Sequence, residues 1–342
     1  MAAGVSSVLG SCETSGPQKQ PISVQSRPAG LRTGLVYDHV YKTHDPGPGH
    51  PESPRRCDAI IDALSKEEFK DRLVRIAPRA ASDEEILLCH TPQYLGTVRR
   101  DIESGASSLS TGDTGVCRDS LKAALLAAGG VLAGVDEVVA RKVRNAFCAV
   151  RPPGHHAAPG RGMGFCVFDN IAIGARYARK NHKIEKVLIV DWDVHHGNGT
   201  QEIFYEDGAV MYFSTHQWPH YPGTGRASET GKGPGEGLIL NCPFPAGAGR
   251  KEILGAMEDK LLPAADRFKP ELVMVSAGFD ARVDDPLGGF RLSDQDFTDM
   301  TTLVMDIARR HAGDRLVSVL EGGYNLTGLA SACAAHVRAL CS

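Results

Sequence analysis

Apolar runs rich in Val, Ile and Leu recur along the chain and alternate with longer amphipathic stretches. The apolar runs are continuous, which is typical of strands buried on both faces. Strands that alternate with helices predict right-handed crossovers and a parallel sheet with helices on both faces, hence an α/β fold. We expect strands at Gly34–Tyr37, Leu73–Ile76, Ala146–Val150, Lys186–Val190, Val210–Phe213, Leu238–Leu240, Leu272–Ser276 and Leu316–Leu320. We expect helices at Ser120–Arg141, Asn170–Lys180, Lys251–Phe268 and Ser293–Arg310.

The N-terminal segment differs from the rest of the chain. Residues 1–31 are rich in Ser, Gly, Pro and Gln and show no sustained periodicity, so we expect a disordered extension. Glu13 is the only acidic residue in this segment, which leaves an organellar targeting peptide as an alternative. Residues 32–342 are expected to form a single folded domain.

Composition and charge exclude several classes of protein. With 42% hydrophobic and 23% charged residues, the chain has the profile of a soluble globular protein. A net charge of -3 indicates no direct nucleic-acid binding, and no apolar stretch is long enough for a membrane helix. The scattered cysteines form no Cys-x-x-Cys pair, so we expect reduced thiols and a cytoplasmic protein, with nuclear or organellar location as alternatives.

Polar residues cluster directly after several predicted strands. In parallel sheets, ligands bind beyond the carboxyl ends of the strands, where such clusters meet. The polar segments are Arg151–His156, Asp191–Thr200, Ser214–His216, Asp280 and Glu321–Tyr324. Their convergence at one edge of the sheet predicts a functional site.

The pattern Asp191-x-Asp193-x-His195 predicts a metal site. Residues i, i+2 and i+4 of an extended chain point to one side, so two carboxylates and an imidazole would converge. Such a group is unfavourable without a cation between its members, and Asp280 can supply a further ligand. Nitrogen and oxygen ligands with an open coordination position are typical of catalytic zinc. The alternative is that the two aspartates only cap a helix that begins near Gly199.

Two further groups have the chemistry of a hydrolytic site. His155 and His156 follow a Pro-Pro-Gly turn, and imidazole titrates near neutral pH, so the pair suits acid–base catalysis. Tyr324 follows the last predicted strand, where its hydroxyl can hydrogen-bond a carbonyl oxygen that gains negative charge. The alternatives are a pair of surface histidines and a tyrosine that only packs.

Together these motifs resemble the histone deacetylases of the class II type, including the bacterial histone deacetylase-like amidohydrolases. The resemblance extends from about Leu35 to the C-terminus and implies an arginase-like fold, a single domain with an eight-stranded parallel sheet and helices on both faces. It also implies that residues 32–342 are a deacetylase catalytic domain. The matching segments are Gly49–Arg56, Arg151–His156, Gly164–Asn170, Asp191–Thr200, Tyr221–Gly225, Ser276–Asp280, Asp285–Leu287 and Glu321–Asn325.

The resemblance implies the metal ligands and the catalytic residues. One zinc ion would be bound by Asp193, His195 and Asp280. The acid–base pair would be His155 and His156, and the carbonyl group would be polarised by Tyr324. A structural potassium ion would be bound by Ser214 and by Asp191, which would also support His155.

The resemblance also implies the reaction and the substrate-binding residues. The reaction would be zinc-dependent hydrolysis of the acetyl or acyl amide of a lysine side chain in a protein, which releases acetate and the free amine. Gly164, Phe165 and Tyr221 would line a tunnel for the acyl-lysine chain, whose alkyl part can lie between aromatic faces. Leu287 would lie at the rim of this tunnel and Arg56 at its inner end, where acetate leaves.

Two positions depart from related patterns. Asn198 stands where class I members have an aspartate, so His156 is expected to titrate lower and to act as the base. Leu287 stands where the polyamine-selective branch has a glutamate that would attract a second ammonium group. The expected substrate is therefore an acetylated protein, with a small acetylated amine such as an acetylpolyamine as the alternative.

Three other functions fit the sequence less well. A two-manganese amidinohydrolase of the arginase type needs an aspartate where this chain has Gly197. A non-catalytic acyl-lysine binding scaffold would not need both histidines, all the ligands and Tyr324. Dinucleotide binding lacks its Gly-x-Gly-x-x-Gly turn after the first strand. The sequence predicts no particular oligomeric state.

Overall fold

The structure, a computed structural model, describes residues 1–4 and 30–342. Almost all of the predicted extension, residues 1–31, lies outside the described residues, so its disorder or targeting role stays a prediction. The chain divides into two units, Met1–Gly30 and Leu31–Ser342. The helices and strands that the structure describes belong to the second unit.

The second unit is built on an eight-stranded sheet in which every pair of neighbouring strands is parallel. The order of strands across the sheet is β2-β1-β3-β8-β7-β4-β5-β6. The predicted parallel α/β sheet is therefore confirmed. The strands are β1 (Thr33–Val36), β2 (Leu73–Ile76), β3 (Ala146–Cys148), β4 (Val187–Asp191), β5 (Val210–Gln217), β6 (Ile239–Phe244), β7 (Leu272–Ala277) and β8 (Leu316–Leu320).

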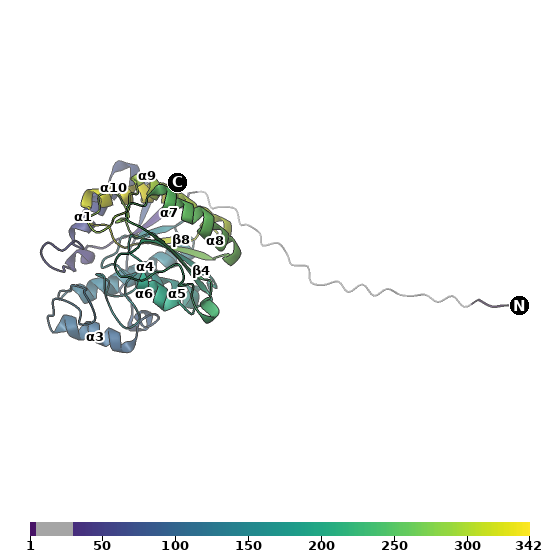
Figure 1. Cartoon of the computed structure of the whole chain (residues 1–342), viewed down its shortest axis with the longest axis horizontal. Helices are drawn as coiled ribbons and strands as arrows, with labels where there is room; N and C mark the ends of the chain where they lie inside the picture. The colour runs from purple at the N-terminus through teal and green to yellow at the C-terminus, as the bar shows by residue number, and fades with distance from the viewer. Residues whose placement is uncertain (5–29) are drawn as a thin grey trace. The chain divides into compact units, whose positions relative to one another are not determined.

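Helices cover both faces of this sheet (Figure 1). One layer contains α2 (Asp83–Ile86), α3 (Pro92–Glu103), α4 (Ser120–Val139), α5 (Asn170–His182) and α6 (Asn198–Phe204). The other contains α1 (Arg55–Leu64), α7 (Arg250–Ala256), α8 (Leu262–Phe268), α9 (Asp294–His311) and α10 (Leu326–Leu340). Shorter helical segments are η1 (His39–Thr43), η2 (Glu67–Phe69), η3 (Gly233–Gly235) and η4 (Met257–Leu261).

Strand residues alternate between two hydrophobic cores. Val187 and Ile189 of β4 face the core shared with α4 and α5, whereas Leu188 and Val190 face the core shared with α9 and α10. All four side chains are fully buried, because successive residues of a strand point to opposite faces of a sheet that is covered on both sides. This double burial explains why the sequence shows continuous apolar runs.

The structure corrects one predicted helix. The segment Lys251–Phe268 is not a continuous α-helix but forms α7, the π-helical turn η4 and α8. Pro263 lies in the first turn of α8. A proline there has no N–H to donate, and its ring displaces the carbonyl group one turn earlier. A π-helical turn accommodates the displaced carbonyl with one extra residue.

The strand order places the predicted polar segments side by side. The strands β3, β8, β7, β4 and β5 are consecutive neighbours in the sheet and run in the same direction. Their carboxyl ends therefore meet at one edge, where the candidate residues follow each strand. No helix that the structure describes is long and apolar enough to cross a membrane.

Candidate functional site

The candidate metal ligands follow β4 and β7. Beyond β4, Trp192 and Val194 pack into the core that faces α9 and α10, which turns Asp193 and His195 to the opposite side. Asp280 follows the end of β7. One ligand atom from each of Asp193, His195 and Asp280 lies within 4.8 Å of the others, and all three residues are buried. The three predicted ligands are thus brought together.

Both aspartates of this cluster accept hydrogen bonds from backbone N–H groups, and each turns one oxygen toward the His195 ring. The Asp193 oxygen that faces the ring, Oδ1, also accepts from the His195 N–H (2.9 Å). Asp193 Oδ2 accepts a hydrogen bond from the Gly322 N–H (2.8 Å), and Asp280 Oδ1 accepts one from the Val194 N–H (2.8 Å). His195 Nδ1 lies 3.0 Å from Asp193 Oδ1 and 3.2 Å from Asp280 Oδ2. Asp280 Oδ2 is buried and accepts no hydrogen bond.

This donor set fits a divalent metal ion of the zinc type. A buried carboxylate oxygen without a hydrogen bond is costly, and a bound cation would satisfy it. Gly322 leaves room there, because a β-carbon at this position would lie 2.1 Å from Asp280 Oδ2. An imidazole and two carboxylates with an open position match catalytic zinc. Among the described residues, this is the one group of three or more metal-ligating side chains close enough to share an ion.

The charges of the cluster depend on one another. Burial raises the pKa of Asp280 to about 7, and the Asp193 carboxylate acts in the same direction. Burial lowers the pKa of His195, but Asp193 and Asp280 outweigh this effect and raise it to about 10. Without a metal, the cluster therefore holds protons at neutral pH, and a metal ion that binds there must displace them.

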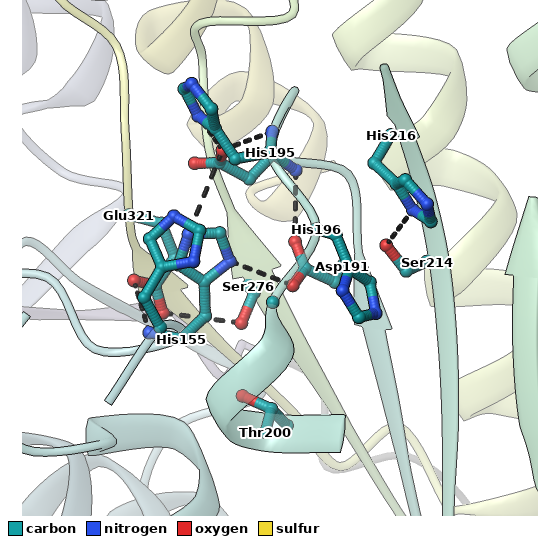
Figure 2. A network of polar contacts seen from close by, with 12 residues as sticks. His155, Asp191, His195, His196, Thr200, Ser214, His216, Ser276 and Glu321 are labelled. Carbon is teal, nitrogen blue, oxygen red and sulfur yellow. Dashed lines mark hydrogen bonds and ion pairs between the residues drawn. The ribbon is translucent and has the colours of Figure 1, made fainter. Parts of the chain in front are cut away.

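His155 follows β3 and is held against Asp191, the last residue of β4 (Figure 2). The distance from His155 Nδ1 to Asp191 Oδ2 is 3.0 Å, and the Tyr212 hydroxyl donates to the same oxygen (2.9 Å). Burial lowers the pKa of His155, but the carboxylates of Asp191 and Asp193 outweigh this effect and raise it well above its usual range. The structure thus brings Asp191 into contact with His155, and its catalytic support of His155 stays a prediction.

His156 lies beside His155 but has a different environment. Its Nδ1 is 2.9 Å from Asn198 Oδ1, while the amide nitrogen of Asn198 faces the His156 carbonyl oxygen at 3.4 Å. The centres of the His155 and His156 rings are 4.1 Å apart. Burial lowers the pKa of His156 well below its usual range, and the positive charges of His155 and His195 act in the same direction.

Tyr324 lies on a turn that is held at several points. The Tyr324 N–H donates to Asp285 Oδ2 (2.7 Å), and the Gly323 carbonyl accepts from Arg56 Nε (2.7 Å). Burial raises the pKa of the Tyr324 phenol well above its usual range, and the Asp280 charge reinforces this effect. The side chain is therefore a protonated hydrogen-bond donor near the metal-ligand cluster.

Arg56 is buried beneath this turn and belongs to an ion cluster. Its Nη1 donates to Glu52 Oε1 (3.0 Å), and its guanidinium carbon lies 5.2 Å from the centre of the Tyr324 ring. Glu52 is also paired with the buried Arg151, which donates to both carboxylate oxygens. Burial acts to raise the pKa of Glu52, but the arginines and His44 outweigh it and hold the pKa well below its usual range. The Arg56 nitrogens donate to protein acceptors, and its predicted place at the inner end of a substrate tunnel stays a prediction.

Aromatic rings flank the histidines and Tyr324. The Phe165 ring lies 5.9 Å from the Tyr324 ring, and the Tyr221 ring lies 5.2 Å from the His156 ring at 88°. Gly164 has φ +57°, and a β-carbon there would lie 2.3 Å from the His156 ring, so glycine is required. The predicted substrate-binding residues Gly164, Phe165 and Tyr221 are thus placed around the site.

Asp113 and Asp285 link the outer residues of the site. Asp113 Oδ1 accepts from the Gly164 N–H (2.7 Å) and lies 3.4 Å from the Tyr221 hydroxyl. Asp285 Oδ1 accepts from the Leu287 N–H (3.0 Å), so one carboxylate orients both Leu287 and the turn that carries Tyr324. Leu287 is partly exposed, and its place at the rim of a substrate tunnel stays a prediction.

The two predicted potassium ligands are neighbours across the sheet. Asp191 of β4 pairs in register with Ser214 of β5. The Ser214 hydroxyl lies 2.9 Å from His216 Nδ1 (Figure 2). Asp191 Oδ1 accepts from the Asp193 N–H (3.1 Å). Potassium binding itself stays a prediction.

Four buried polar side chains of this site had no role predicted from the sequence, namely Glu52, Tyr212, Asp285 and Glu321. Glu52, Asp285 and Glu321 lie within the motifs that carry the family resemblance, so their position in those motifs was an available signal. Tyr212 lies in the middle of a buried strand, where a hydroxyl needs a partner. That need was the only signal for Tyr212.

Comparisons with known proteins agree with this geometry. A family model described as the histone deacetylase domain matches residues 50–340. The chain is 39% identical over 313 residues to the histone deacetylase-like amidohydrolase of Pseudomonas aeruginosa, covering 86% of this chain and 82% of that protein. It is 42% identical over 301 residues to the polyamine deacetylase HDAC10 of Danio rerio, covering 84% of this chain and 44% of that protein. The crystal structure of the HDA15 HD domain is similar, with a TM-score of 0.86, 36% identity and coverage of 91% of this chain and 90% of that chain.

Proposed function

This chain belongs to the histone deacetylase family and is a deacetylase, and we propose that it removes acetyl groups from lysine side chains of proteins in a zinc-dependent hydrolysis. The observation that carries the proposal is the buried cluster of Asp193, His195 and Asp280 beside two histidines and a protonated tyrosine. The products would be acetate and the free lysine amine.

Zinc would be held by Asp193, His195 and Asp280, whose unpaired oxygen and open side fit a catalytic ion. Dependence on zinc is general for the family. When bound, zinc supplies a Lewis acid that polarises the amide carbonyl and lowers the pKa of a water molecule. The remaining steps belong to the side chains of this chain.

The two histidines have separate roles in the proposed mechanism. The Nδ1–H of His156 is directed at Asn198 Oδ1, so the lone pair of its Nε2 is free to accept a proton from the attacking water. His155 shares its Nδ1 proton with Asp191, and this carboxylate stabilises the imidazolium form. A protonated histidine then donates to the nitrogen of the leaving amine.

Tyr324 acts on the carbonyl oxygen of the substrate. Its raised pKa keeps the phenol protonated, so the hydroxyl donates a hydrogen bond as negative charge develops on that oxygen. The turn that carries Tyr324 is fixed by Asp285 and Arg56, which orients the donor before the substrate arrives. We propose that Arg56, which is buried and bonded to the Gly323 carbonyl, marks the inner end of the site, where acetate would leave.

The proposed substrate is acetyl-lysine in a protein or peptide. The Phe165 and Tyr221 rings would flank its alkyl chain, and Leu287 offers no charge to a second ammonium group. The second candidate is an acetylpolyamine, because one relative is named as a polyamine deacetylase. We further propose potassium at Asp191 and Ser214, supported by their register, and a cytoplasmic location, supported by the scattered cysteines.

The test combines a substrate panel with metal analysis of the purified enzyme. Acetyl-lysine peptides should be hydrolysed with a kcat/KM at least about tenfold above that for acetylspermidine. The reason is that Leu287 offers no carboxylate to contact the second ammonium group of the polyamine. The wild type should contain one zinc ion per site. Asp280→Ala should lose the zinc and the activity with an unchanged circular dichroism spectrum, whereas Asp259→Ala, at an exposed position, should keep both. A wild-type preference for acetylspermidine would overturn the proposed substrate.

A further inference from the structure

We propose that Glu321 is a positioning residue for the histidine pair. Its carboxyl group fixes the backbone of the turn that carries His155, so that the imidazole meets Asp191 and the substrate in one orientation. This inference rests on the proposed function, because it assumes that His155 takes part in proton transfer.

Three hydrogen bonds define what the Glu321 carboxyl group does. Oε2 accepts from the N–H groups of Gly154 (2.7 Å) and His155 (3.1 Å). Oε1 accepts from the Ser276 hydroxyl (3.3 Å). Glu321 is fully buried, and Figure 2 shows its contact with Ser276 beside His155. One side chain therefore joins the ends of β3, β7 and β8.

Glu321 is itself fixed by its main chain. Its N–H donates to the Ala277 carbonyl of β7 (3.1 Å), and its carbonyl accepts from Arg56 Nη2 (2.5 Å). The carboxyl group thus projects from a rigid strand end. A support of this kind can hold a catalytic group to within about 0.5 Å of its productive position.

The contacts give His155 two points of attachment. Asp191 holds the ring at Nδ1, and Glu321 holds the backbone N–H. The residue before His155 is Gly154, whose lack of a side chain is required because a β-carbon would lie 2.5 Å from the Asn170 nitrogen. A glycine gives the turn conformational freedom, and the Glu321 carboxyl group removes that freedom.

Two features separate this role from metal binding and from charge. The hydrogen bonds of the Glu321 side chain are with Gly154, His155 and Ser276, not with the zinc-ligand cluster. Oε2 accepts in the ionised carboxyl group and, when the proton lies on Oε1, in the protonated group as well, so the bonds to the two N–H groups do not require a charge on Glu321.

The variants are Glu321→Ala, Glu321→Asp and Glu321→Gln in the full chain with zinc. Glutamine keeps an oxygen for the two N–H groups and can donate its amide to Ser276, so it should restore kcat to within about fivefold of the wild type. Alanine removes the hydrogen bonds to the two N–H groups, and aspartate draws the carboxyl group back from them by one methylene. Both should lower kcat by about 10- to 100-fold, the scale of a small misplacement of a catalytic group, with KM changed less than about twofold and zinc retained.

A second readout does not depend on activity. The hydrogen-bonded Nδ1 proton of His155 should give a downfield proton resonance, identified by its absence in His155→Ala. It should be sharp in the wild type and in Glu321→Gln and shifted or broadened in Glu321→Asp, which also covers the case that Glu321→Ala does not fold. An unchanged resonance together with wild-type kcat in Glu321→Asp would overturn the inference. An inactive wild type would instead remove the proposed function, and the resonance would still decide the role of Glu321.

Discussion

Tyr324 is the side chain whose chemistry depends most on its immediate surroundings. Burial and the charge of Asp280 raise its pKa, so the phenol keeps its proton across the neutral range. The Asp285 carboxylate holds its backbone N–H, and Arg56 lies 5.2 Å from the centre of its ring. Its position is therefore set without help from its hydroxyl group, which stays free for a substrate.

Replacing Tyr324 by phenylalanine removes this hydroxyl and little else. The kcat for an acetyl-lysine peptide should fall by about 10²- to 10³-fold, the usual effect of losing one donor to a developing oxyanion. KM should change much less, because the bond strengthens chiefly in the transition state. Steady-state kinetics with a zinc assay would measure both. Near-wild-type turnover at full zinc content would show that Tyr324 only packs.

At the residue scale, the sequence predicts which side chains converge better than it predicts which residues hold them in place. The convergence of Asp193 and His195 follows from the two-residue period of an extended chain, and the structure brings them to Asp280. Tyr212 could not be placed in this way. Its hydroxyl reaches Asp191 only because β4 and β5 are neighbours in the sheet, and the spacing of residues along the chain does not predict this pairing.

Helix α4 shows how closely the elements approach one another. A β-carbon at Gly129 would lie 1.9 Å from the Arg79 carbonyl oxygen and 2.6 Å from the Ala81 nitrogen. The Ala81 N–H also donates to the Leu125 carbonyl of α4 (2.8 Å), so the backbone segment 79–81 lies directly on the helix. This approach requires a glycine for its size rather than for its backbone freedom.

Gly129→Ala should therefore destabilise the protein although alanine is the better helix former. Overpacking against a fixed backbone should cost about 1–3 kcal/mol in the free energy of unfolding. Gly96→Ala in α3 is the matched control, because nothing lies within 4 Å of its β-carbon position. The control should be stabilised by about 0.5–1 kcal/mol through helix propensity alone. Urea unfolding of both variants gives the comparison, and equal effects would contradict the packing argument.

At the element scale, apolar runs locate the inner strands because double burial leaves a strong signal, as in β8, whose residues are all buried and whose bounds match the prediction. The ends of the helices are less predictable. The π-helical turn before Pro263 arises where one backbone must accommodate a missing N–H, and the amphipathic pattern of residues 251–268 continues through it. The amphipathic pattern indicates which face of the helical segment is buried, but it does not indicate which backbone groups pair in hydrogen bonds.

Zinc should contribute to the stability of the whole domain. An ion that binds only the folded state adds about 4 kcal/mol at a free concentration 1,000 times its Kd. Burial lowers the pKa of His195, but two carboxylates raise it to about 10, so binding displaces protons and strengthens as the pH rises. The zinc-dependent part of Tm should therefore be larger at pH 8 than at pH 6.

Differential scanning calorimetry with and without a chelator measures this contribution. The wild type should lose several degrees of Tm when zinc is removed, as expected from about 2–4 °C per kcal/mol for domains somewhat smaller than this one. Asp280→Ala should show the same Tm with and without the chelator. A chelator effect of equal size in both proteins would place the stabilising ion elsewhere.

At the scale of the whole molecule, the class of fold follows from alternating strands and helices, whereas the order of strands does not. Which way each crossover turns along the sheet depends on packing between distant elements. The order β3-β8-β7-β4-β5 nevertheless decides that the five polar segments lie side by side. The sequence predicts that they meet at one edge, and the folded chain determines which of them are neighbours.

The same order separates the chemistry from the margins of the sheet. The outermost strands are β2 and β6, and neither is followed by one of the proposed catalytic or metal-binding residues. Pro243 of β6 has no N–H to offer to a further strand, which blunts that margin against pairing with another chain. Insertions or mutations could therefore accumulate at the margins while the geometry of the metal-ligand cluster, bracketed by inner strands, is preserved.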